Sequence, residues 1–159
     1  MVVDAGVRLT VEQDSLIVGS LLGDGSMRCK ANALLEMNHS ADQRSYVDWK
    51  YGVLSDLVST PPQLRSTNGS RMAYRFVTRS LPALTPYCRT FYPLGQKIVP
   101  DVEISPLALD VWLMDDGCRS YRAVYLNTQQ FPLADQMCLI HMLERQFSIV
   151  ARVNRDKTY

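Results

Sequence analysis

Two aspartates follow apolar segments that end in glycine-containing turns, and their arrangement suggests metal chemistry. Asp24 lies between Gly23 and Gly25 at the end of LIVGSLLGDG, and Asp116 precedes Gly117 at the end of a second apolar segment, LALDVWLMDDG. A single Asp-Gly pair is ordinary turn chemistry. Two carboxylates that come close together repel each other unless a cation lies between them. The pair therefore predicts a divalent metal site with Asp24 and Asp116 as ligands of Mg²⁺, or of Mn²⁺ or Ca²⁺ in its place.

The backbone around the aspartates also favours a metal site. The glycines around Asp24 leave its side chain and the carbonyl of Gly23 open to a metal ion or a phosphate. A metal ion held by few protein carboxylates keeps positions for phosphate oxygens and water, as hydrolysis of a phosphodiester requires. Asp115 is the alternative second ligand, and alignment of the two Asp-Gly pairs favours Asp116.

Two helices must position these carboxylates. Thr10 and Gln13 have capping-box spacing, which predicts a helix from there to Gly23, and a second helix is predicted over residues 107–116. Gly19 and Gly23 lie four residues apart on one face of the first helix, where another backbone can come close. Packing of the second helix on this face would bring the two acidic tips together.

Short strands and helices are predicted in the rest of the chain. They are two strands within 26–39 around a turn at 30–32, a helix at 42–58, strands at 63–67 and 71–79 joined by Asn68-Gly69, a helix at 83–92, a strand at 119–127, a helix at 133–147 and a strand at 148–154. The order of elements repeats in part after the second apolar helix. This predicts an internal duplication that is incomplete at its end.

Charge is segregated along a chain whose formal net charge is only +1. Residues 63–97 contain six basic residues and no acid, whereas residues 101–116 contain five acids and no base. In the most basic of the predicted strands, odd positions place Arg71, Arg75 and Arg79 on one face. Basic segments on both sides of an acidic segment are typical of a protein that binds phosphate groups and also holds cations. The small net charge predicts limited non-specific affinity for nucleic acid.

The cysteines and histidines do not have the spacing of a metal site. The four cysteines are scattered, without a Cys-x-x-Cys pair, which predicts reduced thiols in an intracellular protein. His39 and His141 are isolated, and ordinary packing or surface roles are expected for both. No apolar run is long enough to span a bilayer, and the first residues lack the order of a signal peptide, so no contact with a membrane is expected.

Six segments, in this order, resemble the LAGLIDADG homing endonucleases, in the branch that carries two motifs in one chain. They are IVGSLLGDG, YVDWKYGVLSDL with its Pro-Pro end, FYPLGQKIVP, LALDVWLMDDG, YLNTQQF and VARVNRDK. The resemblance implies an α+β fold of two pseudo-symmetric αββαββα halves, with saddle-shaped antiparallel sheets along the DNA major groove. The halves would be residues 1–106 and 107–159, packed as one unit through helices 11–23 and 107–116.

The resemblance also implies roles for single residues. Asp24 and Asp116 match the metal ligands of the family, and Lys97 in GQKIVP matches a basic residue that helps to activate water or to stabilise charge. These three are the expected catalytic residues. Nucleic-acid contacts are expected from the basic residues of the sheet faces, which are Arg28, Lys30, Arg65, Arg71, Arg75, Arg79, Arg119 and Arg122.

The second half departs from the family pattern. The chain after Asp116 is short, and the last strand, the closing helix and a second catalytic lysine of the family have no counterpart in it. Three explanations are open: a truncated or fragmentary chain, a second polypeptide that supplies the missing part, or a degenerate protein that has lost cleavage.

Two functions fit these residues. The first is a Mg²⁺-dependent, site-specific endonuclease that hydrolyses phosphodiester bonds in a long double-stranded DNA target. The alternative is an RNA-binding protein on the same scaffold, a splicing maturase or a structural partner of a large ribonucleoprotein, with reduced or lost nuclease activity. The resemblance implies a location in an organelle, a mitochondrion or a chloroplast.

Overall fold

The first apolar segment forms helix α1 (Val11–Leu22) in a computed structural model that describes residues 7–66 and 71–154. The side chain of Thr10 accepts the N–H of Gln13 at 3.1 Å, and the side chain of Gln13 accepts the N–H of Thr10 at 3.0 Å. The predicted capping box is therefore confirmed. It satisfies two backbone donors that a helix start leaves unpaired.

A four-stranded antiparallel sheet follows α1. Its strands, in spatial order, are β1 (Ser26–Cys29), β2 (Ala33–Ser40), β4 (Met72–Val77) and β3 (Gln63–Ser66). The four strands predicted in this part of the chain are confirmed, and the pairing of β3 with β4 is that of a hairpin. Its predicted turn, Asn68-Gly69, lies outside the described residues.

The sheet has one buried and one open face. Leu35 and Met37 of β2 are fully buried, whereas Glu36 and Asn38, which alternate with them, point to the other side. This period-two alternation is the pattern of a sheet that covers a core on one face only. The open face is thus the one on which the charged side chains of β1, β2 and β4 gather.

Helices cover the buried face. Helix α2 (Arg44–Leu54) lies between two 3₁₀ turns, Ala41–Gln43 and Ser55–Leu57, and helix α3 (Thr85–Phe91) follows a third, Pro82–Leu84. The helices predicted at 42–58 and 83–92 are therefore confirmed, with 3₁₀ turns at their ends. Val47 and Leu54 of α2 are fully buried against the sheet.

The second apolar segment begins a smaller unit. It consists of helix α4 (Pro106–Asp116), the two-stranded antiparallel sheet of β5 (Gly117–Arg119) and β6 (Val124–Leu126), and helix α5 (Leu133–Phe147). The predicted helices at 107–116 and 133–147 are confirmed.

Two strand predictions in this unit are wrong. The segment predicted as one strand at 119–127 is a hairpin, because the N–H of Ser120 donates to the carbonyl of Ala123 and closes a turn in its middle. The strand predicted at 148–154 does not form: Ser148 ends α5 in a left-handed conformation (φ 56°), and none of the described strands pairs with the segment after it. Alternating residues make a strand only where a partner strand is within reach.

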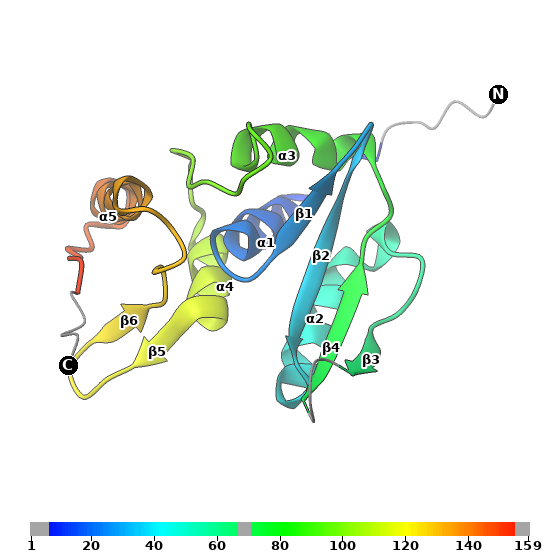
Figure 1. Cartoon of the computed structure of the whole chain (residues 1–159), viewed down its shortest axis with the longest axis horizontal. Coiled ribbons are helices and arrows are strands. Elements are labelled where there is room, and N and C mark those ends of the chain that lie inside the picture. Colours follow the sequence, from blue (N-terminus) through cyan, green and yellow to red (C-terminus); the bar gives the residue numbers. More distant parts are fainter. Residues whose placement is uncertain (1–6, 67–70, 155–159) are drawn as a thin grey trace.

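Helices α1 and α4 lie side by side at the centre of the molecule, between the two sheets (Figure 1). A Cβ atom on Gly19 would lie 2.4 Å from the carbonyl oxygen of Ala108 and 2.7 Å from the Cβ of Val111. The absence of a side chain at Gly19 thus allows the close approach that the spacing of glycines predicted. None of the described helices has the length and apolar character needed to cross a membrane.

One expectation about the cysteines is wrong. Cys29 of β1 and Cys88 of α3 form a disulfide, with Cα atoms 6.0 Å apart, whereas Cys118 and Cys138 are free. The two residues are 59 positions apart in sequence, and only the packing of α3 beside β1 brings them together. Reduced thiols at all four positions were expected from their scattered spacing, which contains no information on this contact.

Candidate active site

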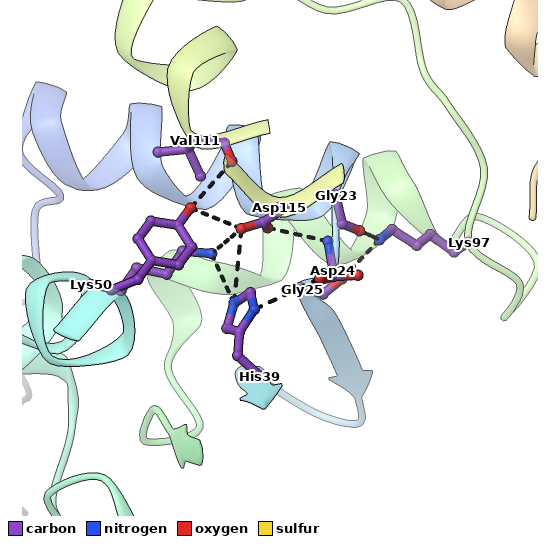
Figure 2. A network of polar contacts seen from close by, with 9 residues as sticks. Gly23, Asp24, Gly25, His39, Lys50, Lys97, Val111 and Asp115 are labelled. Carbon is purple, nitrogen blue, oxygen red and sulfur yellow. Dashed lines mark hydrogen bonds and ion pairs between the residues drawn. The ribbon is translucent and has the colours of Figure 1, made fainter. Parts of the chain in front are cut away.

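The two acidic turns meet where α1 and α4 end. The N–H of Asp24 donates to Oδ2 of Asp115 at 3.2 Å, and a Cβ atom on Gly23 would lie 2.5 Å from the Cβ of Asp115. Gly23 therefore permits a contact between the helix ends that a larger residue would prevent. Figure 2 shows this contact, with His39, Lys50 and Lys97 reaching it from three other segments.

Asp116 has a buried carboxylate with an unused acceptor. The residue is 6% exposed, and its Oδ2 has no hydrogen-bond partner among the residues that the structure describes. Burial, followed by the charges of Asp24 and Asp115, raises the pKa of Asp116 to about 7. An unsatisfied buried acceptor is destabilising by roughly 1–3 kcal/mol. This carboxylate therefore suits a bound cation.

Asp24 lies at the open side of the same site. Its side chain is 46% exposed. Burial and then the charge of Asp115 raise the pKa of Asp24, whereas His39, Lys50 and Lys97 lower it. Mutual repulsion of neighbouring carboxylates is the condition that a divalent cation relieves.

The donor set fits a cation held by few protein ligands. Residues 7–66 and 71–154 contain no group of three or more His, Cys, Asp or Glu side chains that could hold a metal ion. Asp24 and Asp116 would have to share an ion with backbone, water or phosphate oxygens. Mg²⁺ is commonly bound in this way, through one or two carboxylates and the phosphate of a substrate.

Lys97 lies against the turn that carries Asp24. Its Nζ donates to the carbonyl oxygens of Gly23 at 2.7 Å and Gly25 at 2.8 Å (Figure 2). Burial lowers the pKa of Lys97 to about 8, although the charges of Asp116 and Asp24 raise it. The carbonyl of Gly23, a predicted ligand, is thus already an acceptor for Lys97 and keeps one lone pair for a second partner.

Asp115 is in a different environment from Asp116. Its side chain is fully buried. Oδ1 accepts hydrogen bonds from Lys50 Nζ at 2.7 Å and from the Tyr46 hydroxyl at 2.8 Å, while Oδ2 accepts the N–H of Asp24. Both oxygens of Asp115 are therefore engaged by donors of the protein, whereas Asp116 retains an oxygen without one.

Two functional candidates were not predicted from the sequence. Lys50 of α2 is fully buried and forms an ion pair with Asp115, so a lysine of the first sheet's helix neutralises an acid at the tip of α4. His39, at the end of β2, lies with Nε2 3.2 Å from Lys50 Nζ and with Nδ1 3.7 Å from Oδ2 of Asp24. Burial and the charge of Lys50 lower the pKa of His39.

The sequence contained one signal for each of them. His39 lies on the same buried face of β2 as Leu35 and Met37, and Lys50 follows Tyr46 by one helical turn on the face of α2 that packs inward. A polar residue at a core position must find a partner when it is buried. The partner, Asp115, could not be identified because it lies on a distant helix.

Several of the predicted nucleic-acid contacts gather on the open face of the first sheet. Arg28 and Arg75 both form ion pairs with Glu36, at 2.5 Å and 3.1 Å. A cavity of about 830 Å³ with mainly polar walls is lined by Glu36, by Asp24 and by Arg71, which directly precedes β4. One arginine of the predicted arginine face and one of the acidic tips therefore border the same open space.

The remaining predicted contacts are more dispersed. Arg65, Arg75 and Arg79 line a second cavity of about 250 Å³, and Arg79 also donates to the carbonyl of Asp56 at 2.8 Å. Of the described basic residues predicted to contact nucleic acid, four line neither cavity: Arg28 in β1, Lys30 in the β1–β2 turn, Arg119 in β5 and Arg122 in the turn after it.

Comparison with known proteins identifies the family. The sequence profile of the LAGLIDADG DNA endonuclease family matches residues 14–159, a range that includes all of α4 and α1 from Asp14 onward. The chain belongs to this family. The expectation drawn from the motifs is thereby confirmed.

Relatives of this LAGLIDADG protein have several names. It is 33% identical over 125 residues to a RecA protein of Mycobacterium gastri, covering 72% of this chain and 28% of that protein. It is 26% identical over 160 residues to the cytochrome b mRNA maturase bI2 of Debaryomyces hansenii, covering 92% of this chain and 61% of that protein. The chain therefore spans less than two thirds of the length of either relative.

A solved structure shows the same fold. The homing endonuclease I-WcaI bound to its DNA recognition sequence matches with a TM-score of 0.85 and 22% sequence identity, over 95% of this chain and 74% of that one. The α+β fold with antiparallel sheets is thus the fold of a homing endonuclease.

Proposed function

We propose that this LAGLIDADG protein is a divalent-metal-dependent endonuclease that cuts long, specific sites in double-stranded DNA. The observation that supports the proposal is the contact between the ends of α1 and α4, made by Asp24 and Asp115, beside which the buried Oδ2 of Asp116 has no donor among the described residues. Membership of the family and the fold shared with a DNA-bound homing endonuclease support it.

The proposed metal ligands are Asp24 and Asp116, with Mg²⁺, Mn²⁺ or Ca²⁺ as the ion and the Gly23 carbonyl as a further oxygen. Of the two alternatives for the second ligand, Asp116 is preferred because both oxygens of Asp115 already accept protein donors. Asp115 instead holds the backbone of Asp24. When bound, the metal ion would stabilise the charge that develops on the scissile phosphate and supply an activated water.

Lys97 is proposed as the third catalytic residue. Hydrogen bonds to Gly23 and Gly25 hold its ammonium beside the carboxylates. With a pKa of about 8 the group is mostly charged at neutral pH and can lose a proton at little free-energy cost. It can therefore stabilise negative charge on a phosphate or exchange a proton with water.

The DNA interface is proposed to follow the open faces of the two sheets. Its first part would be the cavity lined by Asp24 and Arg71, next to Arg75 of β4, which pairs with the cavity residue Asn38. Strands present alternate side chains to a groove, and arginines can contact guanine or phosphate. The other proposed contact residues are Arg28, Lys30, Arg65, Arg79, Arg119 and Arg122.

The chain is proposed to consist of two pseudo-symmetric halves, 1–106 and 107–159. The order α1, β1, β2, α2 has a counterpart in α4, β5, β6, α5. Only the first half contains a second strand pair among the described residues. A second polypeptide that pairs with the second sheet is proposed as a partner of this half.

A cleavage selection tests the proposal. The protein is incubated with a randomised double-stranded DNA pool and Mg²⁺, and new ends are sequenced; recurrent cuts within one long motif are expected. Asp24→Asn keeps the size of the side chain and should bind the motif without cutting it. Asp110→Asn, an exposed position on α4, is the matched control and should cut like the wild type. Binding of a motif without any cutting by the wild type would argue against nuclease activity.

An RNA-binding role is the second candidate. The relative from Debaryomyces hansenii is named a cytochrome b mRNA maturase, which favours structured RNA or a ribonucleoprotein as the alternative partner. In that case Asp24 and Asp116 should tolerate substitution, whereas Arg71, Arg75 and Arg79 should not. An organellar location remains a prediction, because matched relatives come from mycobacteria as well as from yeasts.

A further inference from the structure

One acidic residue stands among the arginines of the open sheet face. Glu36, in the middle of β2, accepts Arg28 of β1 on Oε2 at 2.5 Å and Arg75 of β4 on Oε1 at 3.1 Å. In the register of the sheet, Arg28 is opposite Leu34 and Arg75 is opposite Asn38, so both reach Glu36 diagonally from opposite sides. The three side chains form a bridge across three neighbouring strands.

This bridge contributes little to folding. The side chains of Arg28 and Arg75 are 59% and 37% exposed, and exposed ion pairs add little to stability. Its main effect is on the geometry of the arginines. Each uses one terminal nitrogen on Glu36, and a guanidinium has five N–H donors in a fixed plane, so the others stay available to a ligand.

The location of the bridge determines which ligand it would meet. Glu36 lines the cavity of about 830 Å³ whose wall includes Asp24. The opposite face of the sheet is closed by the core, where Leu35 and Met37 are fully buried. A nucleic acid that approaches Asp24 along this face would therefore pass over Glu36 and its two arginines.

The charge of Glu36 discriminates between phosphate and base. A carboxylate between two guanidinium groups lowers the net charge of the trio to that of a single cation and repels a phosphate that comes close. The O6 and N7 acceptors of guanine are neutral and match the planar donors of arginine. Side chains that are held in place before binding also lose less rotamer freedom when they bind.

We propose that Glu36 is a positioning residue for base recognition, which holds Arg28 and Arg75 so that they read guanines in the major groove of double-stranded DNA instead of contacting phosphates. This inference rests on the proposed function, because it requires a DNA duplex on the open sheet face.

The test is a binding selection without cleavage. Wild-type protein, Glu36→Gln and the control Glu12→Gln select ligands from a randomised double-stranded DNA pool in EDTA. Glu12 is an exposed acid at the start of α1, so its substitution makes the same change in net charge away from the sheet. The wild type and Glu12→Gln are expected to select the same motif, which contains guanines.

Glu36→Gln should lose the preference at one or two guanine positions and keep it elsewhere. The expected loss is about 5- to 150-fold per position, the range for a good bidentate arginine–guanine contact. Arg28→Gln and Arg75→Gln should each lose preference at one of the same positions. Binding of non-specific DNA by Glu36→Gln should become tighter, and its dependence on salt steeper by about one phosphate contact.

Three outcomes would overturn the inference. The first is a Glu36→Gln motif identical to that of the wild type, and the second is a weakening spread evenly over all positions, which is the signature of phosphate contacts. The third is a wild-type protein that selects no motif. This last result would refute sequence-specific DNA binding itself, whereas the first two leave the proposed function in place.

Discussion

Replacement of Asp116 by asparagine should stabilise the metal-free protein at alkaline pH. A carboxyl whose pKa is higher in the folded state favours folding at low pH, and this contribution is lost as the pH rises through the folded-state pKa. The pKa of Asp116 is raised from 3.8 to about 7. At about 1.4 kcal/mol per pKa unit, the free energy of unfolding should fall by up to about 4 kcal/mol between pH 4 and pH 8 because of this group.

Asparagine has a similar size and no charge, so Asp116→Asn should not show this fall. Urea unfolding in EDTA at pH 4, 6 and 8 measures the difference. The two proteins should be equally stable near pH 4, and the variant should be more stable at pH 8 by roughly 2–4 kcal/mol. Asp110→Asn, on the same helix and exposed, should follow the wild type at every pH.

A divalent cation should remove most of this difference in stability. Mg²⁺ at 100 times its dissociation constant would stabilise the wild type at pH 8 by about 2.7 kcal/mol, because it binds only the folded state. The Asp116→Asn variant should gain little. Parallel pH profiles of wild type and variant in EDTA would refute the argument that Asp116 is an ionisable group held in an unfavourable environment.

Three further predictions follow from single contacts. Lys50→Met leaves the buried carboxylate of Asp115 without its cation and should lower the free energy of unfolding by about 3–5 kcal/mol in urea titrations, with the double variant Lys50→Met/Asp115→Leu recovering part of the loss. Gly19→Ala introduces a Cβ atom 2.4 Å from the carbonyl oxygen of Ala108 and should lower the free energy of unfolding by about 1–3 kcal/mol. In the control Gly52→Ala the new Cβ atom meets nothing within 4 Å, so this change in α2 should raise the free energy of unfolding by about 0.5–1 kcal/mol. Lys97→Met should lower the cleavage rate on the selected motif by about 10²- to 10⁴-fold with unchanged DNA binding, and an unaltered rate would remove Lys97 from the proposed mechanism.

Local signals predicted the elements that position the site. The capping box at Thr10 and Gln13 determines where α1 begins, and the absence of a side chain at Gly19 permits the contact with α4. Both are properties of residues and their near neighbours, which a sequence contains directly. The contact between the two acidic turns follows from them, since helices that pack along their length also meet at their ends.

Contacts between distant segments were not predictable in the same way. Lys50 and His39 occupy core positions whose partner, Asp115, lies on another helix more than sixty residues away. The Cys29–Cys88 disulfide likewise depends on how α3 packs beside β1. The strand expected at 148–154 has the right alternation and lacks a partner among the described strands. In each case the deciding interaction is tertiary.

Cleavage of the selected DNA motif by matched variants is the most direct test of the central claim. The wild type, Asp24→Asn and Asp116→Asn are compared on the same duplex, with Mg²⁺ present and with binding measured separately in EDTA. The account predicts cutting by the wild type only, and equal binding by all three proteins. Cutting by either variant at the wild-type rate would contradict the assignment of Asp24 and Asp116 as the residues that hold the metal ion.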